Sequence, residues 1–185
     1  MTRNRSALLA LAVTAAAAAV LLAMGRPAIC TCGTVELWVG AADSPKTSQM
    51  LADWYSPSHV IHGFAFYGLL WLLARRQPLG ARFLAALALE LAWELVENSD
   101  WAIQRYREAT IAVGYTGDSV LNTLSDVAMM AAGFWLARRL PTWATIAIAL
   151  LLEAAALAAV RDNLTLNVWM FVWPTDAIRA WQAGS

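Results

Sequence analysis

Five stretches of the chain are long and predominantly apolar, and polar segments separate them. They cover residues 7–24, 58–74, 82–97, 118–137 and 141–160. A helix of about 20 apolar residues crosses the ~30 Å hydrocarbon core of a bilayer. The pattern therefore predicts an all-α membrane protein, with residues 1–185 forming a single integral membrane domain built as a bundle of about five transmembrane helices.

The first apolar stretch has two interpretations. Its sequence is ALLALAVTAAAAAVLLAM, and Arg3 and Arg5 precede it. A basic flank before an alanine-rich core is also typical of a cleaved signal peptide. The run is longer than the usual core of a signal peptide, and no clean A-x-A cleavage motif follows. These features favour a retained transmembrane helix.

Composition supports the membrane interpretation and narrows the range of partners. The chain is 60% hydrophobic and 14% charged, whereas soluble domains are about 45–50% apolar and about 25% charged. The formal net charge is zero, so nothing indicates binding to nucleic acid. We expect membrane lipids to be the surroundings of this protein.

The positions of arginine predict the orientation of the helices. Cytoplasmic loops are enriched in Lys and Arg, and residues 1–6, 75–82 and 138–140 contain arginine but no acidic residue. We therefore expect the N-terminus in the cytoplasm and the C-terminus in the periplasm. The expected outer segments are loop 25–57, loop 98–117 and an interfacial tail over 161–185.

Two features of the outer segments carry further expectations. Residues 98–117 favour a short amphipathic helix that ends at Gly114 or Gly117. Cys30 and Cys32 are the only cysteines, and a disulfide between residues two apart is geometrically unfavourable. We therefore favour two unpaired small residues in a loop, with a redox pair or a soft-metal site as the alternatives.

Three of the apolar stretches each carry a polar stripe at helical spacing. The stripes comprise His59 and His62; Glu90, Glu94 and Glu97; and Asp118, Asn122 and Asp126. Side chains three or four residues apart share one face of a helix. Because successive helices alternate in direction, all three stripes are expected in the outer half of the membrane. His62 lies deeper than His59, which makes it the stronger candidate of the two.

A bound cation is the leading explanation for these stripes. A carboxylate at bilayer depth costs roughly 2.5–3.5 kcal/mol, and no Lys or Arg lies beside the acidic residues. The remaining solutions are protonation, a water-filled vestibule or a divalent ion such as Zn²⁺, Mn²⁺ or Mg²⁺, which histidine and carboxylate ligands suit. The whole polar set forms the candidate metal site, and Glu94 and Asp118 are the candidate catalytic residues.

Less specific roles remain open for several of these residues. Asn122 and Ser125 could hold helices together by hydrogen bonds, and His59 could be interfacial. Glu97 and Asp118 could be solvated caps, with Asp118 as a helix N-cap. Glu153 could face the same site. Three glycines, Gly63, Gly68 and Gly133, are expected to let helix backbones approach closely.

Long motifs resemble those of known membrane proteins. The stretches DWYSPSHVIHGFAFYGLLWLL, ELAWELVENSD, GDSVLNTLSD and RDNLTLNV closely resemble an uncharacterised family of bacterial multi-pass inner-membrane proteins. The pattern of His62, Glu94 with Glu97, and Asp118 with Asn122 more distantly resembles VanZ-like membrane proteins, a family linked to glycopeptide-antibiotic resistance. The resemblance implies an inner-membrane location and a shared site architecture.

These observations lead to three functional hypotheses. The leading one is an inner-membrane protein whose periplasm-facing site binds a divalent cation and acts on an envelope lipid or lipid-linked precursor. The second is a small transporter or proton-relay protein, although five helices without an inverted repeat differ from standard carriers. The third is a scaffold or assembly subunit. Whether the protein is an enzyme stays open at this stage.

Overall fold

The computed structural model describes residues 3–184, with side chains from Arg5 onward. This part of the chain is all α-helical, with eight helices and one isolated β-bridge between Val39 and Asp53. The five long helices are α1 (Arg3–Ala23), α2 (Ser56–Ala74), α3 (Leu79–Glu97), α5 (Val120–Arg139) and α6 (Thr142–Val160). The three short helices are α4 (Asp100–Ala109), α7 (Leu164–Val172) and α8 (Asp176–Ala183). The predicted all-α class is confirmed.

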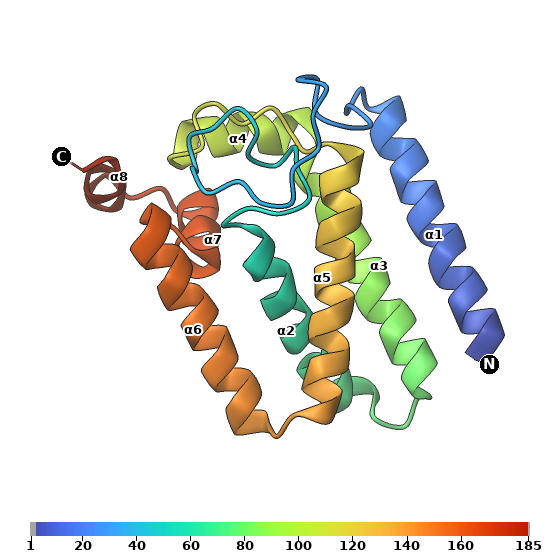
Figure 1. Ribbon diagram of the computed structural model, residues 1–185. Helices are drawn as coiled ribbons and strands as arrows, with labels where there is room; N and C mark the ends of the chain where they lie inside the picture. The colour runs from blue at the N-terminus through green and yellow to red at the C-terminus, as the bar shows by residue number, and fades with distance from the viewer. Residues whose placement is uncertain (1–2, 185) are drawn as a thin grey trace.

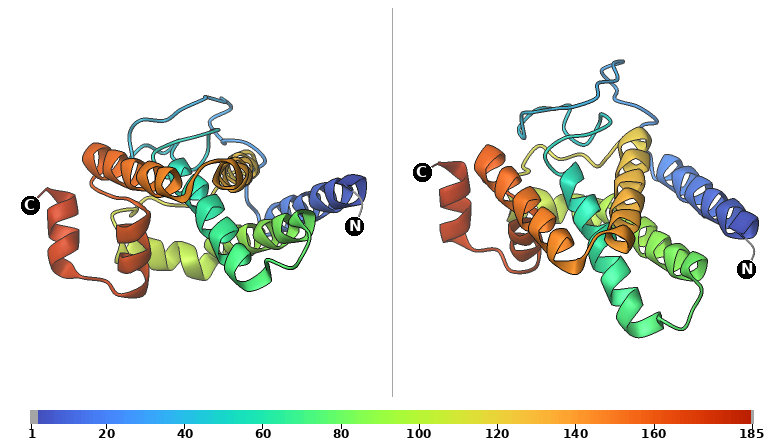
Figure 2. Two further views of the ribbon diagram at one scale, coloured as in Figure 1. Left: turned by 90° about the horizontal axis from the view of Figure 1, so that it is seen from below. Right: turned by 60° about the horizontal axis from the view of Figure 1, so that its bottom comes forward.

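The five long helices alternate in direction along the chain. In Figure 1, α1, α3 and α6 run upward, whereas α2 and α5 run downward. Seen from below, α2 lies between α3 and α6, and α1 lies beyond α3 at one edge (Figure 2). Helix α4 crosses the upper end of the bundle, and α7 and α8 lie beside that end (Figure 1). The short connections that contain arginine therefore meet at the lower end.

Three of the long helices have the length and composition of membrane spans. They are Arg5–Ala23 of α1, α5 and α6, which have mean hydropathies of 2.3, 1.3 and 2.1. Helices α2 and α3 each have 19 residues, but polar and charged side chains interrupt their apolar sequence. The structure thus supports three of the five predicted spans.

Two predicted helix boundaries were wrong. Ser119, and not Asp118, is the N-cap of α5, because its side chain accepts a hydrogen bond from the Asn122 amide. Helix α4 ends at Ala109, well before Gly114 and Gly117, because the backbone becomes extended at Thr110. The Thr110 hydroxyl donates to the carbonyl oxygen of Tyr106 at 2.8 Å, which satisfies one acceptor of the last turn.

Helices α2 and α5 form the closest helix pair, and two glycines make this possible. A Cβ atom added to Gly63 would lie 2.2 Å from the carbonyl oxygen of Met130. A Cβ added to Gly133 would lie 2.2 Å from the carbonyl oxygen of Val60. The expectation for these two glycines is confirmed. It was wrong for Gly68, because a Cβ there would meet nothing within 4 Å.

An apolar core fills the bundle below the polar stripes. It is built from buried side chains of α1, α3 and α5: Ala17, Ala86, Leu87, Leu91, Val127, Met130 and Phe134. Tyr67 of α2 and Phe83 of α3 pack edge-on against Phe134, with ring centroids 5.2 and 5.3 Å apart. Helix α1 therefore packs into the bundle through Ala17, on the apolar side of the molecule.

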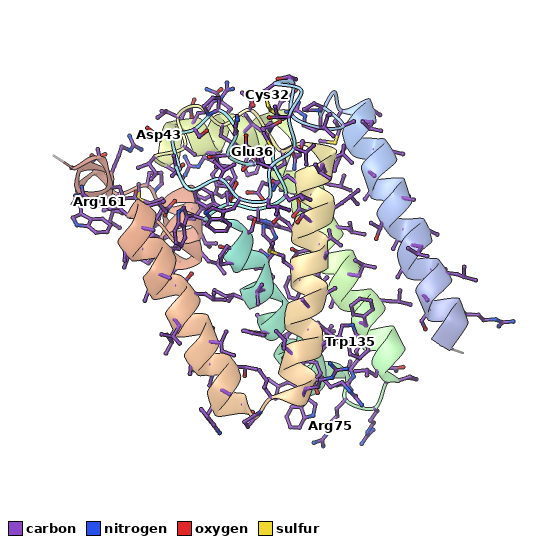
Figure 3. The ribbon with its side chains drawn as sticks, viewed as in Figure 1. Cys32, Glu36, Asp43, Arg75, Trp135 and Arg161 are labelled. Carbon is purple, nitrogen blue, oxygen red and sulfur yellow. A yellow bond between two sulfur atoms is a disulfide. The ribbon has the colours of Figure 1, made fainter. Side chains whose placement is uncertain are left out.

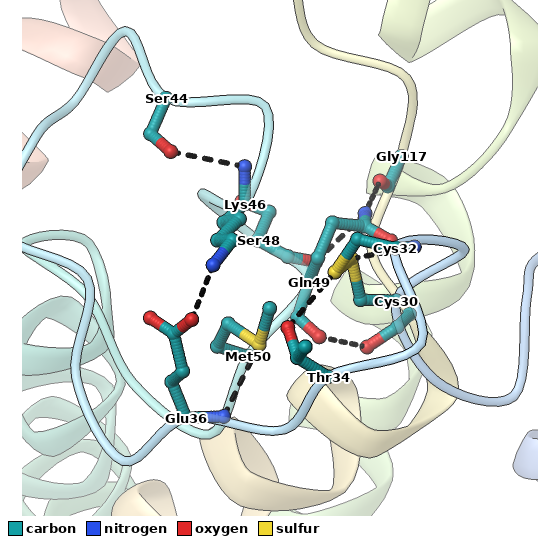
Figure 4. Close-up of a disulfide and its surroundings, with 11 residues drawn as sticks. Cys30, Cys32, Thr34, Glu36, Ser44, Lys46, Ser48, Gln49, Met50 and Gly117 are labelled. Carbon is teal, nitrogen blue, oxygen red and sulfur yellow. Dashed lines mark hydrogen bonds and ion pairs between the residues drawn. A yellow bond between two sulfur atoms is a disulfide. The ribbon is translucent and has the colours of Figure 1, made fainter.

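The segment between α1 and α2 covers the upper end of α5. The amides of Val120 and Leu121 donate to the carbonyl oxygens of Pro27 and Ala28 at 2.8 and 3.1 Å. Next to these carbonyls, Cys30 and Cys32 form a disulfide (Figure 4). The expectation of two unpaired cysteines was therefore wrong, because a tight turn brings the two sulfur atoms together despite their short separation in sequence.

Candidate functional site

The polar stripes of α2, α3 and α5 meet at the upper end of the bundle. Helices α2 and α5 begin at this end and α3 finishes there, so their polar turns lie at the same height (Figure 1). Figure 3 shows Glu36, Asp43 and Arg161 toward the upper end and Arg75 at the lower end, so acidic labelled residues lie only at the upper end. The alternation predicted from the sequence brings all eight candidate site residues into one region.

Glu90 holds both histidines. Its side chain is 0% exposed, and its two carboxylate oxygens lie 2.6 Å from His59 Nδ1 and 3.0 Å from His62 Nδ1. A carboxylate that accepts from Nδ1–H fixes the tautomer and ring orientation of a histidine. In both rings this leaves Nε2 as the atom available for a ligand. The rings themselves meet edge to face at 5.2 Å.

His59 also faces two further carboxylates. Its Nδ1 lies 3.4 Å from Glu94 Oε1, and its Nε2 lies 3.7 Å from Asp126 Oδ2. Ligand atoms of His59, Glu94 and Asp126 all lie within 4.8 Å of one another, as do those of His59, His62 and Glu90. His59 is thus the more central of the two histidines. His59 meets carboxylates of both α3 and α5, whereas His62 contacts only Glu90 among the acidic residues. The preference for His62 as the site histidine stays a prediction.

Several oxygen atoms in this cluster are buried without a hydrogen-bond partner. They are both carboxylate oxygens of Glu94, Oδ1 of Asp126 and Oγ1 of Thr123. Glu94 is only 1% exposed, so bulk water cannot compensate for the missing partners. Leaving a buried charged acceptor unsatisfied costs more than the ~1–3 kcal/mol of a neutral group. These atoms need a proton, ordered water or a cation.

A cavity opens beside the cluster. It occupies about 630 Å³, including the space that is open to solvent. The predicted residues in its wall are His59, His62, Glu97, Asp118, Asn122 and Asp126. Glu90 and Glu94 lie directly behind this wall through their contacts with His59. Within residues 3–184, the wall contains no Lys or Arg.

Asp118 is anchored by hydrogen bonds. Asn98 donates from its side-chain amide to Asp118 Oδ2 at 2.7 Å and accepts from the Asp118 backbone amide at 2.7 Å. The Tyr115 hydroxyl donates to Asp118 Oδ1 at 3.0 Å. Burial raises the pKa of Asp118, although these bonds oppose the rise. The arrangement joins the end of α3 to the start of α5, and a catalytic role for Asp118 stays a prediction.

Asn122 has a structural partner as well as a place in the wall. Its side-chain amide donates to the carbonyl oxygen of Met50 at 2.9 Å. Ser119 donates from its hydroxyl to the carbonyl oxygen of Gln49 at 2.9 Å. These bonds fasten the segment before α2 onto α5. The expected partner of Asn122 was another helix, whereas the observed partner is a loop carbonyl. Asn122 also lines the cavity.

Sequence reasoning missed several wall residues that come from loops and short helices. They are Asp53, Tyr55, Tyr106, Tyr115 and Asn167. Asp53 accepts from the amides of Ser48 and Tyr55 at 2.7 and 2.8 Å. Burial and the nearby Asp118 carboxylate raise the pKa of Tyr115, which keeps its hydroxyl protonated as a donor. Of these residues, only Asp53 could have been predicted from the sequence, because it is acidic and lies just before α2, the helix that carries both histidines.

Glu153 does not belong to the cavity. Its carboxylate oxygens accept from the backbone amides of Leu164 and Thr165 at 2.9 and 3.0 Å. It therefore stabilises the N-terminus of α7, where a negative charge is favourable. The expectation that it could face the same site was wrong.

Comparisons with known proteins identify the family. A family model described as "Protein of unknown function (DUF2585)" matches residues 21–184. The chain is 56% identical over 161 residues to a UPF0314 protein of Sinorhizobium fredii, covering 87% of this chain and 82% of the relative. It is 55% identical over 163 residues to that of Paracoccus denitrificans, covering 88% and 84% of the two chains. It is 53% identical over 178 residues to that of Sphingopyxis alaskensis, covering 96% and 94%. No solved structure matches. The chain therefore belongs to the DUF2585 family of bacterial proteins, whose relatives are named UPF0314.

Proposed function

We propose that this protein is a five-span bacterial inner-membrane protein whose cavity opens to the periplasm and binds a divalent cation. The observation that carries the proposal is Glu94, a buried carboxylate whose two oxygens have no hydrogen-bond partner and whose Oε1 lies 3.4 Å from His59 Nδ1. A cation bound between Glu94, His59 and Asp126 would satisfy these atoms together.

The topology is supported by the alternating helices and by their charged ends. Helices α2 and α3 lie between the candidate spans α1, α5 and α6 in the bundle and have nearly the same length. The basic residues Arg75, Arg138 and Arg139 gather at the end opposite the cavity. By the rule that cytoplasmic loops are basic, that end faces the cytoplasm and the cavity faces outward.

The ligand set suits a borderline transition metal. His59 would bind through Nε2, since its Nδ1 is engaged by Glu90, an arrangement common in carboxylate–histidine–metal sites. Glu94 and Asp126 would supply oxygen ligands. Imidazole with carboxylate favours Zn²⁺ or Mn²⁺ over Mg²⁺, which prefers oxygen ligands. An ion here would act as a Lewis acid toward a phosphoryl or acyl oxygen.

The substrate class we propose is an envelope lipid or a lipid-linked precursor. Its polar group would enter the cavity, while Glu94 or Asp118 would act as general acid or base. Support comes from the likeness to VanZ-like proteins: the motif residues His62, Glu97, Asp118 and Asn122 line the same cavity, and Glu94 lies directly behind it.

A transport role receives less support. A carrier or proton relay needs polar groups that continue toward the other face. Below Asp126, the buried side chains are Val127, Met130 and Phe134. This apolar layer offers a relay no polar groups beyond Asp126.

Metal titration of the full-length protein in detergent tests the proposal. Chelator-treated wild type is expected to bind about one Zn²⁺ or Mn²⁺ per chain by calorimetry, and Glu94→Gln to bind at least tenfold more weakly. Glu108→Gln is the matched control, because Glu108 is exposed on α4 away from the cavity. Equal, negligible binding by all three folded proteins would overturn the cation site. A scaffold role instead predicts that Glu94→Gln changes stability alone.

A further inference from the structure

The disulfide between Cys30 and Cys32 is asymmetric in its exposure. These are the only cysteines of the chain, so no other thiol of the protein competes with them. Cys30 is buried, 5% exposed, against Val39 and Met50. Cys32 is exposed. The exposed Cys32 is therefore the side of the disulfide that an incoming thiolate would reach, while Cys30 is sheltered. Figure 4 shows the two residues and their neighbours.

Each sulfur has a hydrogen-bond donor. The backbone amide of Cys32 donates to Cys30 Sγ at 3.2 Å. Thr34 Oγ1 lies 3.1 Å from Cys32 Sγ, and since a disulfide sulfur carries no hydrogen, the hydroxyl is the donor. Donors directed at sulfur stabilise a thiolate, and a stabilised thiolate leaves faster in thiol–disulfide exchange. The donor on Cys30 thus stabilises the sulfur that would be released.

The backbone keeps the two sulfurs together without the covalent bond. The Gly33 amide donates to the Cys30 carbonyl oxygen at 3.0 Å, and Gly33 has φ +75°, which favours glycine. The ring that the disulfide closes spans only residues 30–32, so it restricts the unfolded chain less than a long loop would. The bonds from Val120 and Leu121 to residues 27 and 28 hold the segment independently. Opening the disulfide would therefore leave a paired dithiol in a folded protein.

We propose that Cys30 and Cys32 form a thiol–disulfide exchange site that reacts with dithiols of partner proteins at the outer face. A partner thiolate attacks Cys32 Sγ, a mixed disulfide forms, and Cys30 leaves as a thiolate that takes up a proton. The second partner thiolate then attacks the partner's own sulfur in the mixed disulfide and releases Cys32. The partner dithiol loses two electrons and becomes a disulfide, while Cys30 and Cys32 become thiols. In the proposed topology this site lies in the oxidising periplasm, where disulfides persist.

Glutathione is the probe for the first test. The full-length protein in detergent is equilibrated with graded ratios of reduced and oxidised glutathione, and maleimide gel shift counts free thiols. The pair is expected to pass from disulfide to dithiol within this range while circular dichroism stays unchanged. A disulfide that resists excess reduced glutathione in the folded protein, and opens only on unfolding, would show a purely structural bond and overturn the proposal.

Single variants test the asymmetry. With oxidised glutathione, Cys32 in Cys30→Ser is expected to form a mixed disulfide at least tenfold faster than Cys30 in Cys32→Ser. Thr34→Val in the Cys30→Ser background should slow this reaction at neutral pH and shift its pH profile upward, because the hydroxyl donor is lost. Equal rates in the two single variants would contradict the assignment of Cys32 as the attacked sulfur.

Discussion

Replacing Gly63 by alanine tests the packing that positions the site. An added Cβ would lie 2.2 Å from the Met130 carbonyl oxygen and 2.5 Å from the Phe134 amide nitrogen. Both are rigid backbone atoms of α5. Because non-bonded contacts lie near 3.5 Å, the two helices must separate by about 1 Å. Gly68→Ala on the same helix is the matched control, since a Cβ there meets nothing within 4 Å.

The two substitutions are expected to change the free energy of unfolding in different directions. Overpacking costs about 1–3 kcal/mol, and a gap of this size loses about a quarter to a half of the dispersion energy across the interface. We therefore expect Gly63→Ala to lower the free energy of unfolding by about 2–3 kcal/mol, which is a melting temperature roughly 5–10 °C lower. Gly68→Ala is expected to be neutral or to raise it by about 0.5–1 kcal/mol, because alanine favours a helix.

Thermal unfolding in detergent, followed by circular dichroism, measures both variants. A second readout is the affinity for Zn²⁺. His59 is one turn from Gly63, so separation of the helices lengthens the 3.7 Å distance from His59 Nε2 to Asp126 Oδ2. Wild-type stability of Gly63→Ala, or an equal loss in Gly68→Ala, would refute the close contact between α2 and α5.

Three further predictions follow from individual side chains. Glu90→Gln can accept from only one of the two histidines, so we expect Zn²⁺ affinity in calorimetry to fall about 10–100-fold; an unchanged affinity in a folded variant contradicts the role of Glu90. Burial raises the pKa of Asp162 to about 6 from 3.8, so the folded state holds this proton more tightly than the unfolded state. Protonated Asp162 therefore stabilises the folded state fully below pH 4. This contribution to the free energy of unfolding, up to about 3 kcal/mol, is lost as pH rises to 6. Asp162→Asn should flatten the dependence of melting temperature on pH between 4 and 6.5, and an unaltered slope would exclude Asp162 as its source. Glu153→Gln weakens the acceptor at the start of α7, so amide hydrogen exchange of Leu164 and Thr165 should accelerate, whereas equal exchange rates would rule out the cap.

The candidate site was predictable as a set, but its pairings were not. Helical spacing identified the histidines of α2 and the glutamates of α3, and alternating directions placed them at one end of the bundle. It did not reveal that Glu90 meets both histidines or that the carboxylate oxygens of Glu94 lack a hydrogen-bond partner. Those contacts depend on how each helix is rotated about its axis. Gly63 and Gly133 allow the close approach of α2 and α5, but the sequence does not show how α3 packs against this pair.

The loop residues of the cavity wall were harder to predict from the sequence than the helical ones. Asp53, Tyr106 and Tyr115 lie outside the long apolar stretches, so no period marked them as neighbours of the histidines. Asp118 was expected in the site, but only the structure shows that both its carboxylate oxygens are engaged, by Asn98 and Tyr115. The pairing of Cys30 with Cys32 also depends on a local turn that the spacing of the cysteines does not reveal.

The sequence by itself determined the helical class, the approximate limits of the five long helices, the basic and acidic ends, and the polar faces of α2, α3 and α5. These properties are local, because hydropathy and a period of 3.6 residues act within one helix. The tertiary structure alone decided which buried carboxylate is unsatisfied, how residues 27–50 close over α5, and which sulfur of the disulfide is exposed. Each of these depends on contacts between residues far apart in sequence, such as Asn122 with Met50, and such contacts exist only after the helices have packed.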